Sequence, residues 1–514
     1  MKHSNAILSF AGWILGSFLL LLLSCGTDDP IPSVDDNDDD GGEQVTIVPA
    51  VEDLEIISTE NPNELKVSWI YPEEATSVEL SYYPEGEDEA GAVNNNIRRT
   101  TGDKGSFLIK VSEHGTYIVG AVAIDNYGNR SEKVTVKATP MREEDVPKTL
   151  FLERADMLMS SLIDLCFGKS PRDCWNTRYP NATGPYWDGD AVVWGQGSGL
   201  SGFVALRNAA IGTEYEAKYT AMTDRMYNSI NRFITTDNNL NAYAVYPQNG
   251  NQRFYDDNVW IGLDMAELYR QTGENRFLEK AEMVWDYLMV GNTGSAGGGI
   301  LWREIPAYSN KHTCSTAPAA VLGCKLYEIT KEEKYLNKAK ELYAWLKQYL
   351  QDPSDHLFYD NITPGMVVDK AKYSYNSGQP MQAACLLYNI TGEQKYLEDA
   401  AQIAISAHRR WFSLYNSKEL GEEFYRINGD HAWFFAIMFR GFIELYKIDK
   451  RRTYINSFEK SMLQAWESEC RDRATNLLSN RYFVNQTQTS WEVLHEGGFV
   501  EMLAQLAALE KEGL

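Results

Sequence analysis

Residues 263–288 read LDMAELYRQTGENRFLEKAEMVWDYL, and three later segments repeat the same pattern. The repeats are LGCKLYEITKEEKYLNKAKELYAWL at 322–346, AACLLYNITGEQKYLEDAAQIAISAH at 383–408 and FIELYKIDKRRTYINSFEKSMLQAW at 442–466. The four copies align on Tyr269, Tyr327, Tyr388 and Tyr446. These tyrosines are 58, 61 and 58 residues apart, so the chain contains a long internal repeat.

Each copy predicts two helices joined by a short turn. Apolar residues recur at helical spacing on both sides of a turn that carries Gly273 or Gly392. The eighth residue after the aligned tyrosine is aromatic in every copy: Phe277, Tyr335, Tyr396 and Tyr454. A helical hairpin with one apolar face cannot bury that face alone, so neighbouring copies must pack together.

The number of copies suggests how they close. Repeats of about 60 residues exceed the usual solenoid periods of about 34–47, and residues 143–514 have room for about six of them. Six hairpins can close into a double ring of helices, so we expect an all-α (α/α)6 barrel over 143–514. An open helical solenoid is the alternative.

Residues 51–140 have a different pattern. Apolar and polar residues alternate in 65–69 (LKVSW), 78–82 (VELSY) and 117–123 (YIVGAVA), which predicts a small all-β sandwich. Trp69 and the segment TYIVGAVAIDNYGNRS (116–131) resemble a fibronectin type III module. No catalytic group is evident in it, so we expect a spacer, with sugar binding as the alternative.

The N-terminus is typical of an exported lipoprotein. Lys2 and His3 precede an apolar run that ends in Leu22-Leu23-Ser24-Cys25, which resembles the bacterial lipobox. We therefore expect residues 1–24 to be a signal peptide and Cys25 to be lipidated; a retained transmembrane helix is the alternative.

Residues 25–50 are predicted to form an extended acidic tether. The segment GTDDPIPSVDDNDDDGG (26–42) has seven Asp and no Lys or Arg, so its charges repel one another. Acidic residues at this place resemble the surface-export signal of Bacteroidetes lipoproteins. We expect a lipid-anchored protein of the outer membrane that is exposed on the cell surface; a periplasmic orientation is the alternative.

The composition argues against nucleic acid as a binding partner and against a metal or other cofactor. The formal net charge of −24 argues against nucleic acid, which clustered cations must bind. The seven cysteines form no CxxC pair and the sequence contains no HExxH, so no metal or other cofactor is expected. Cys166 and Cys174, or Cys314 and Cys324, could pair after export, but we favour buried free thiols.

A pair of acidic residues stands before one repeat copy, in Tyr255-Asp256-Asp257-Asn258-Val259-Trp260. Such residues often cap a helix. One cap is enough, however, and glycosidic cleavage needs two carboxyl groups, one to protonate the leaving oxygen and one to attack the anomeric carbon or activate water. Mutual repulsion would raise the pKa of one of them.

Polar and aromatic residues also precede the other inner helices. Aromatic rings can stack on sugar rings, and amides or carboxylates can bond sugar hydroxyls, although each residue could equally be core or cap. These helix-start clusters contain Trp194 and Gln196, Trp302, Tyr375 and Asn376, and Asp430. Their recurrence makes a carbohydrate cleft attractive, with Trp194 and Gln196 among the residues that line it.

Four segments resemble successive motifs of glycoside hydrolase family 76, the endo-α-1,6-mannanases. They are YDDNVWIGLDMAELYRQTG (255–273), GGGILW (297–302), YSYNSGQPMQAACLLYNITGEQKYL (373–397) and GDHAWFFAIMFRGFIEL (429–445). The resemblance implies an (α/α)6 barrel that cleaves internal α-1,6-mannosidic bonds with retention. It implies Asp256 as nucleophile and Asp257 as acid/base. By position, it also implies that the cleft is lined by Asn258, Trp302, Tyr375, Asn376 and Asp430.

Two departures from the family pattern concern specificity. Arg303 follows Trp302 where the family often has a second Trp, and Ser377 replaces the Gln of the usual YNQG. Activity is expected, with altered subsite preference. The alternative functions are a surface glycan-binding lipoprotein that does not cleave, and a transglycosylase acting on a related α-linked glycan; protein partners and oligomeric state are not predicted.

Overall fold

The computed structural model describes residues 48–59, 63–100, 102–141, 150–183, 189–248, 252–304, 310–478 and 488–512. The predicted signal peptide, Cys25 and nearly all of the acidic tether lie outside the described residues. Within them, no helix combines the length and the apolar character needed to cross a membrane. Residue contacts divide the chain into two compact units, one containing 68–105 and 118–136, the other 56–67, 106–117 and the chain from 137 onward.

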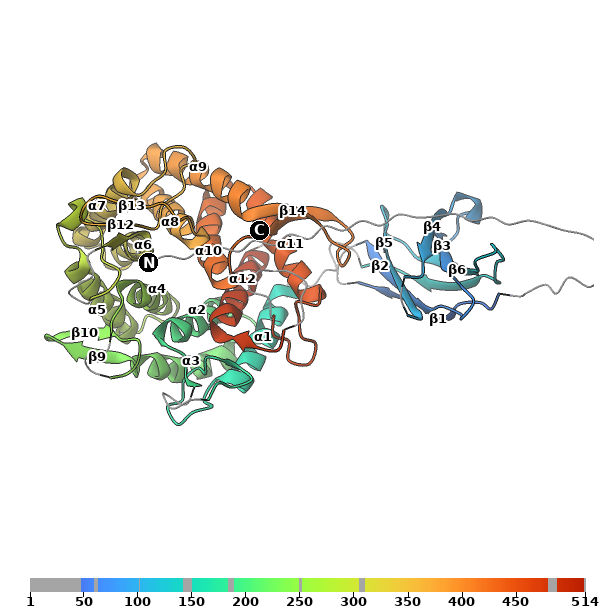
Figure 1. Cartoon of the computed structure of the whole chain (residues 1–514), viewed down its shortest axis with the longest axis horizontal. Coiled ribbons are helices and arrows are strands. Elements are labelled where there is room, and N and C mark those ends of the chain that lie inside the picture. Colours follow the sequence, from blue (N-terminus) through green and yellow to red (C-terminus); the bar gives the residue numbers. More distant parts are fainter. Residues whose placement is uncertain are drawn as a thin grey trace, which may run out of the picture. The chain divides into compact units, whose positions relative to one another are not determined.

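The N-terminal strands form two sheets (Figure 1). One sheet has the order β1-β2-β5 and the other β4-β3-β6-β7. Their bounds are β1 Glu52–Ser58, β2 Glu64–Ile70, β3 Ser77–Pro84, β4 Val93–Arg98, β5 Lys104–Lys110, β6 Tyr117–Ile124 and β7 Val134–Ala138. The predicted alternation is confirmed in β2, where Leu65, Val67 and Trp69 are buried and Lys66 is exposed.

Twelve α-helices lie in the described part of 150–512. They are α1 Leu150–Cys166, α2 Val193–Ala210, α3 Glu216–Asn231, α4 Tyr255–Thr272, α5 Asn275–Gly291, α6 Thr313–Thr330, α7 Glu333–Tyr349, α8 Ser374–Thr391, α9 Gln394–Trp411, α10 Ala432–Asp449, α11 Thr453–Glu467 and α12 Val493–Lys511.

The even-numbered helices form a closed ring (Figure 1). Each contacts the next, from α2 through α4, α6, α8 and α10 to α12, and α12 contacts α2. The odd-numbered helices, called outer here, pack on these even-numbered inner helices; α11, for example, contacts both α10 and α12. In an open solenoid the first and last units would not meet.

Close approach of the inner helices depends on residues without a side chain. A Cβ atom at Gly378 of α8 would lie 2.3 Å from the Cα atom of Met438 in α10. A Cβ atom at Gly441 of α10 would lie 2.4 Å from the carbonyl oxygen of Gly378. The two backbones are therefore nearly in contact, and an added methyl group would have to push the helices apart.

The aromatic signature of the repeat joins neighbouring outer helices. Each aromatic residue near the start of an outer helix packs against a ring of the preceding outer helix, with centroids 5.2–5.6 Å apart. The pairs are Phe277 with Tyr227, Tyr335 with Trp285, Tyr396 with Tyr343, and Tyr454 with His408. The residues that revealed the repeat thus connect its successive copies.

The aligned tyrosines mark helix ends. In each copy the tyrosine carbonyl accepts a hydrogen bond from a C-terminal cap residue in the left-handed region. Two of these caps are glycines, at Gly273 and Gly392, whereas Lys331 (φ 61°) and Lys450 (φ 58°) occupy the others. A side chain in this conformation costs free energy that glycine does not.

Replacing the two lysine caps is therefore expected to stabilise the protein. Lys331→Gly and Lys450→Gly should each raise the free energy of unfolding by about 0.5 kcal/mol, since relief of backbone strain exceeds the loss of an exposed lysine–tyrosine contact. Thermal unfolding would measure this as a higher melting temperature. Lys340→Gly within α7 is the matched control and should lower the stability by about 1 kcal/mol; a loss at Lys331 as large as at Lys340 would contradict the prediction.

Short strands lie in the connections that lead into the inner helices. They are β8 Arg178–Tyr179, β9 Ile234–Asp237, β10 Leu240–Tyr243, β11 Lys311–His312, β12 Asn361–Ile362, β13 Val368–Asp369, β14 Phe412–Asn416, β15 Glu423–Ile427 and β16 Trp491–Glu492. They belong to the same end of the ring as the starts of α4, α6, α8, α10 and α12. The predicted site residues also lie at this end.

Candidate active site

The second residues of five inner helices, α2, α4, α6, α8 and α10, converge at one end of the ring. The ring of Trp433 lies 5.3 Å from that of Trp194 and 5.9 Å from that of Tyr375. On α4 and α6, the Sγ atom of Cys314 lies 3.5 Å from Oδ2 of Asp256. The site is therefore assembled from five helix starts that are far apart in the sequence.

Asp256 is held by three donors. Trp302 Nε1 donates a hydrogen bond of 2.8 Å to Oδ2, the thiol of Cys314 donates to the same oxygen, and the backbone N–H of Asp257 donates to Oδ1 over 2.9 Å. Burial raises the pKa of Asp256 to about 6, and the hydrogen bond from Trp302 is the largest opposing effect. These donors favour the ionised carboxylate.

Asp257 has a different environment. Among the residues that the structure describes, none donates a hydrogen bond to its carboxyl group. Burial, and then the charge of Asp256, raise the pKa of Asp257 well above its ordinary value. Both side chains keep partial solvent exposure. The pair therefore holds its proton preferentially on Asp257 and its charge on Asp256.

The position of Trp302 follows from backbone pairing. The N–H of Tyr255 donates to the carbonyl of Trp302 over 2.8 Å, and Phe254 forms a β-bridge with Arg303. The indole ring is packed edge-on against Phe254 and stacked on His312, with centroids 4.9 and 5.5 Å away. Trp302 was predicted as a cleft residue, and the structure places it directly on the Asp pair.

A buried lysine fixes the glycine-rich segment before Trp302. Lys311 Nζ donates to the carbonyls of Gly291, Thr293 and Gly299 and to the hydroxyl of Thr293, over 2.8–3.3 Å. The lysine side chain is fully buried. Its ammonium group thereby joins the end of α5, at Gly291, to the glycine-rich turn, at Gly299.

Trp194 and Tyr375 form an aromatic wall with residues of α10. Trp194 packs on Trp433, and the ring of Tyr375 lies 4.0 Å from that of Phe434. Trp260 of α4 also packs on Trp433, with centroids 5.3 Å apart. Trp194 and Tyr375 are partly exposed, so sugar rings can reach them.

Gln196 and Asn258 are predicted cleft residues that instead hold backbone. Asn258 bonds the N–H and C=O of Tyr243 and the C=O of Phe254. Gln196 bonds the N–H and C=O of Trp175 in the same way. Both side chains are buried and fully committed, so they position connections and do not line the site.

This role recurs in the repeat. The fourth residue of each of five inner helices accepts a hydrogen bond from a backbone N–H of the preceding connection. These residues are Gln196, Asn258, Thr316, Ser377 and Glu496. Ser377 was expected to alter substrate contacts, but it is buried and accepts from Phe358 N–H. A polar residue three places after a helix start thus indicates a structural contact here.

Asp430 also holds neighbouring backbone groups. Its Oδ2 atom accepts hydrogen bonds from the N–H and hydroxyl of Ser374 at the start of α8, and Oδ1 accepts from His431 N–H. Burial raises its pKa. With 8% of its surface exposed, Asp430 joins the starts of α8 and α10, and it does not reach the site as predicted.

Asn376 points toward a carboxylate that the sequence analysis missed. Its Nδ2 atom donates to Oδ1 of Asp360 over 3.0 Å, while its buried Oδ1 atom has no hydrogen-bond partner. The other oxygen of Asp360 accepts from Asn361 and lies 3.6 Å from Nδ1 of His312. The order Tyr359-Asp360-Asn361 echoes the Tyr-Asp-Asp-Asn of the predicted pair, which is the signal that could have identified it.

Cys314 is a second residue that the sequence analysis did not place in the site. It lies beside Asp256 and has no disulfide partner; Cys166, Cys174, Cys314, Cys324, Cys385 and Cys470 are all free and buried. The preference for buried free thiols is thus confirmed. Burial raises the pKa of Cys314 well above its usual value, so the thiol keeps its proton and acts as a donor.

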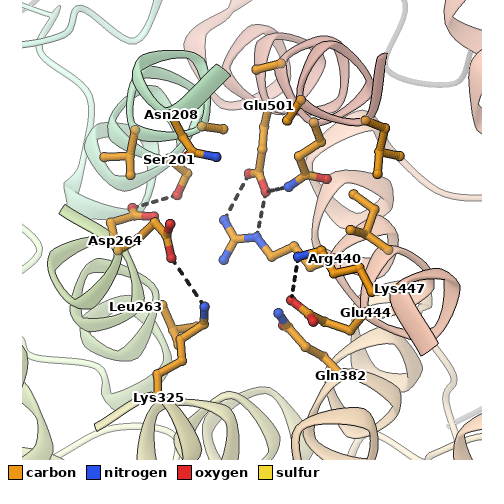
Figure 2. Close-up of a pocket in the computed structure, with 18 of the residues that line it drawn as sticks. Ser201, Asn208, Leu263, Asp264, Lys325, Gln382, Arg440, Glu444, Lys447 and Glu501 are labelled. Carbon is orange, nitrogen blue, oxygen red and sulfur yellow. Dashed lines mark hydrogen bonds and ion pairs between the residues drawn. The ribbon is translucent and has the colours of Figure 1, made fainter. Parts of the chain in front are cut away.

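A separate polar cavity of about 170 Å³ lies further along the inner helices (Figure 2). Its residues stand two or more turns beyond the helix starts. Arg440 Nε and Nη2 donate to Glu501 over 2.6 and 3.0 Å, and the Ser201 hydroxyl donates to Asp264 over 2.7 Å. Lys325 faces Glu267 at 3.5 Å. The cavity is distinct from the Asp256 and Asp257 site.

Asp264 in this cavity should make stability depend on pH. Burial raises its pKa to about 7, and Arg440 opposes that shift. Between the ordinary pKa of Asp and about 7, the folded state therefore keeps this proton while the unfolded state has lost it. The contribution of Asp264 to the free energy of unfolding is thus present at low pH and is lost as the pH rises through about 7. Asp264→Asn is expected to raise the melting temperature at pH 8 and to leave it nearly unchanged at pH 4.5. An equal shift at both pH values would contradict the assignment.

Comparison with known proteins identifies relatives of the helical region. The model of glycosyl hydrolase family 76 matches residues 153–513. The crystal structure of a family 76 glycoside hydrolase from a bovine Bacteroides thetaiotaomicron strain is 41% identical, with a TM-score of 0.74, and covers 90% of this chain and 100% of that chain. The family 76 mannosidase Bt3792 of Bacteroides thetaiotaomicron is 51% identical, with a TM-score of 0.69 and coverage of 71% and 100%.

Fungal relatives are more distant. Mannan endo-1,6-alpha-mannosidase DCW1 of Candida glabrata is 23% identical over 158 residues, which are 28% of this chain and 35% of that protein. The chain spans less than half of the length of the curated relatives that it matches.

Proposed function

Because the chain belongs to glycosyl hydrolase family 76, and is thus a glycoside hydrolase, we propose that it cleaves internal α-1,6-mannosidic bonds of mannan with retention. The observation that carries the proposal is the unequal environment of two adjacent carboxyl groups. Asp256 receives three hydrogen bonds, and Asp257 receives none from the described residues. One carboxylate and one carboxylic acid side by side are what double displacement requires.

Each carboxyl group then has one role in each step. Asp256 attacks the anomeric carbon as the bond to the leaving oxygen breaks, and Asp257 gives that oxygen its proton. The product of this step is a glycosyl ester on Asp256. Asp257, now ionised, takes a proton from water as the water oxygen attacks the same carbon and releases Asp256. Trp302 and Cys314 orient Asp256 throughout.

The substrate class rests on the family and on the chemistry of the site. The Candida glabrata relative is named a mannan endo-1,6-alpha-mannosidase. Partly exposed Trp194, Trp302 and Tyr375 offer faces for neutral sugar rings, and the partly exposed carboxyl group of Asp360 offers acceptors for hydroxyl groups. We assign Gln196, Asn258 and Asp430 to positioning the connections around this site.

The proposal also covers the architecture of the chain and its location in the cell. The closed ring of six inner helices is proposed to be the (α/α)6 barrel, and the N-terminal sheets a fibronectin type III-like spacer. Residues 1–24 are proposed to direct export, with a lipid on Cys25 and an acidic tether over 25–50. This would hold the enzyme on the outer membrane where it meets polymeric glycan.

The test is incubation of the full-length chain, in detergent, with unbranched α-1,6-mannan. A ladder of manno-oligosaccharides supports endo cleavage, and proton NMR of the first product should show the α-anomer before mutarotation. The Asp256→Asn/Asp257→Asn double variant is the control. Binding without cleavage would establish the non-catalytic alternative, initial β-anomer would exclude retention, and products longer than the substrate would indicate transglycosylation.

A further inference from the structure

Tyr373 extends the aromatic wall to the protein surface. It directly precedes α8, and 39% of its surface is exposed. Its ring centroid lies 6.1 Å from that of Tyr375 and 5.8 Å from that of Phe434. The three rings form one continuous apolar surface, of which Tyr373 is the outermost member.

This surface begins at the reacting groups. Tyr375 interacts with the Cys314 thiol, and that thiol lies 3.5 Å from Oδ2 of Asp256. The contacts run from Asp256 through Cys314 and Tyr375 to Tyr373. They therefore lead outward from the bond to be cleaved. A glycan chain that enters the site has units beyond that bond, and these units need a surface outside it.

The backbone around Tyr373 is fixed on both sides. Lys372, before it, forms ion pairs of 2.6 and 2.7 Å with Asp352 and Asp355. Ser374, after it, is held by Asp430 through two hydrogen bonds of 3.0 Å. An exposed ring on a fixed backbone is preorganised, so contact with a ligand would cost little conformational entropy.

Carboxylates accompany the exposed ring. The charges of Asp360, Asp369 and Asp430 all act on the Tyr373 hydroxyl and raise its pKa, after burial as the main cause. Asp360 and Asp369 lie on the connection that contains β12 and β13. A flat ring with hydrogen-bond acceptors nearby suits a neutral polyhydroxylated ring, whereas a large apolar ligand would leave the acceptors unpaired.

We infer that Tyr373 is the platform of an outer subsite, where one sugar unit of the glycan stacks beyond the bond that is cleaved. The inference rests on the proposed function and specifies which residue makes the enzyme favour long chains over short ones. Tyr373 contacts substrate there without acting on the reacting atoms.

The test compares chain lengths. For Tyr373→Ala in the full-length protein, kcat/KM should be unchanged on the shortest linear α-1,6-manno-oligosaccharide that the wild type cleaves. It should fall about tenfold on oligosaccharides long enough to reach the outer subsite, mainly through a higher KM. Tyr373→Phe keeps the ring and should behave like the wild type.

Matched controls separate this subsite from general effects. Tyr425 on β15 is 51% exposed, and Tyr425→Ala should leave kcat/KM unchanged at every length. Equal loss at all lengths, no loss at any length, or a Tyr373→Phe variant as weak as Tyr373→Ala would overturn the inference. The wild type is measured first. If it cleaves no α-mannan, the proposed function itself is overturned, before any variant is compared.

Discussion

Asp256→Ala is expected to reduce kcat by about 10⁴-fold or more, because the substitution removes the proposed nucleophile that forms the glycosyl ester. The three donors that surround Asp256, from Trp302, Cys314 and the backbone of Asp257, would remain in place around an empty volume. The fold should be retained, since Asp256 is partly exposed and Trp302 is also held by backbone pairing with Tyr255. Initial rates on α-1,6-mannan would measure the loss.

Azide distinguishes the loss of a nucleophile from other damage. The anion can occupy the volume that the side chain leaves and attack the anomeric carbon of an activated α-mannosyl fluoride once, which yields the β-mannosyl azide. Asp264→Asn on the same helix is the control and should keep wild-type turnover. Turnover close to wild type in Asp256→Ala, or formation of the α-azide, would show that another group is the nucleophile.

Asp257→Ala is expected to lower kcat on mannan by about 10² to 10⁴-fold, the usual contribution of an acid/base group. The loss should be small for an activated substrate whose leaving group needs no proton. Azide should then attack the glycosyl ester on Asp256, and two inversions give the α-mannosyl azide. Formation of the β-azide by this variant would show that Asp257 is the nucleophile and Asp256 the acid/base.

The pH profile of kcat/KM gives an independent measurement of the same pair. Asp256 must be ionised, so the rate should fall as the pH drops below its raised pKa of about 6. Asp257 must be protonated, so the rate should fall again as the pH rises above its own raised pKa. In Asp257→Ala the alkaline limb should disappear. A wild-type optimum near pH 4 would contradict both shifts.

Local pattern together with the resemblance to glycoside hydrolase family 76 was sufficient for part of the site. Two carboxyl groups at one helix start exceed what capping needs, and the resemblance gave Asp256 and Asp257 their expected roles and placed Trp302 in the cleft. Gln196, Asn258 and Asp430 are also polar residues near aromatic residues and helix starts, but they bond backbone groups of other segments. Nothing in their local sequence distinguishes a group that faces substrate from one that holds a connection.

The sequence by itself determined the repeat, the helical hairpins and the strands before them, because periodicity and turn residues act over a few neighbouring positions. It also placed the adjacent carboxyl groups at the start of α4. The tertiary structure alone decided that α12 meets α2 and closes the ring, that Cys314 and Asp360 reach the site, and that Trp302 and Cys314 donate to Asp256. These features depend on burial and on contacts between different elements of the fold, which no local pattern specifies.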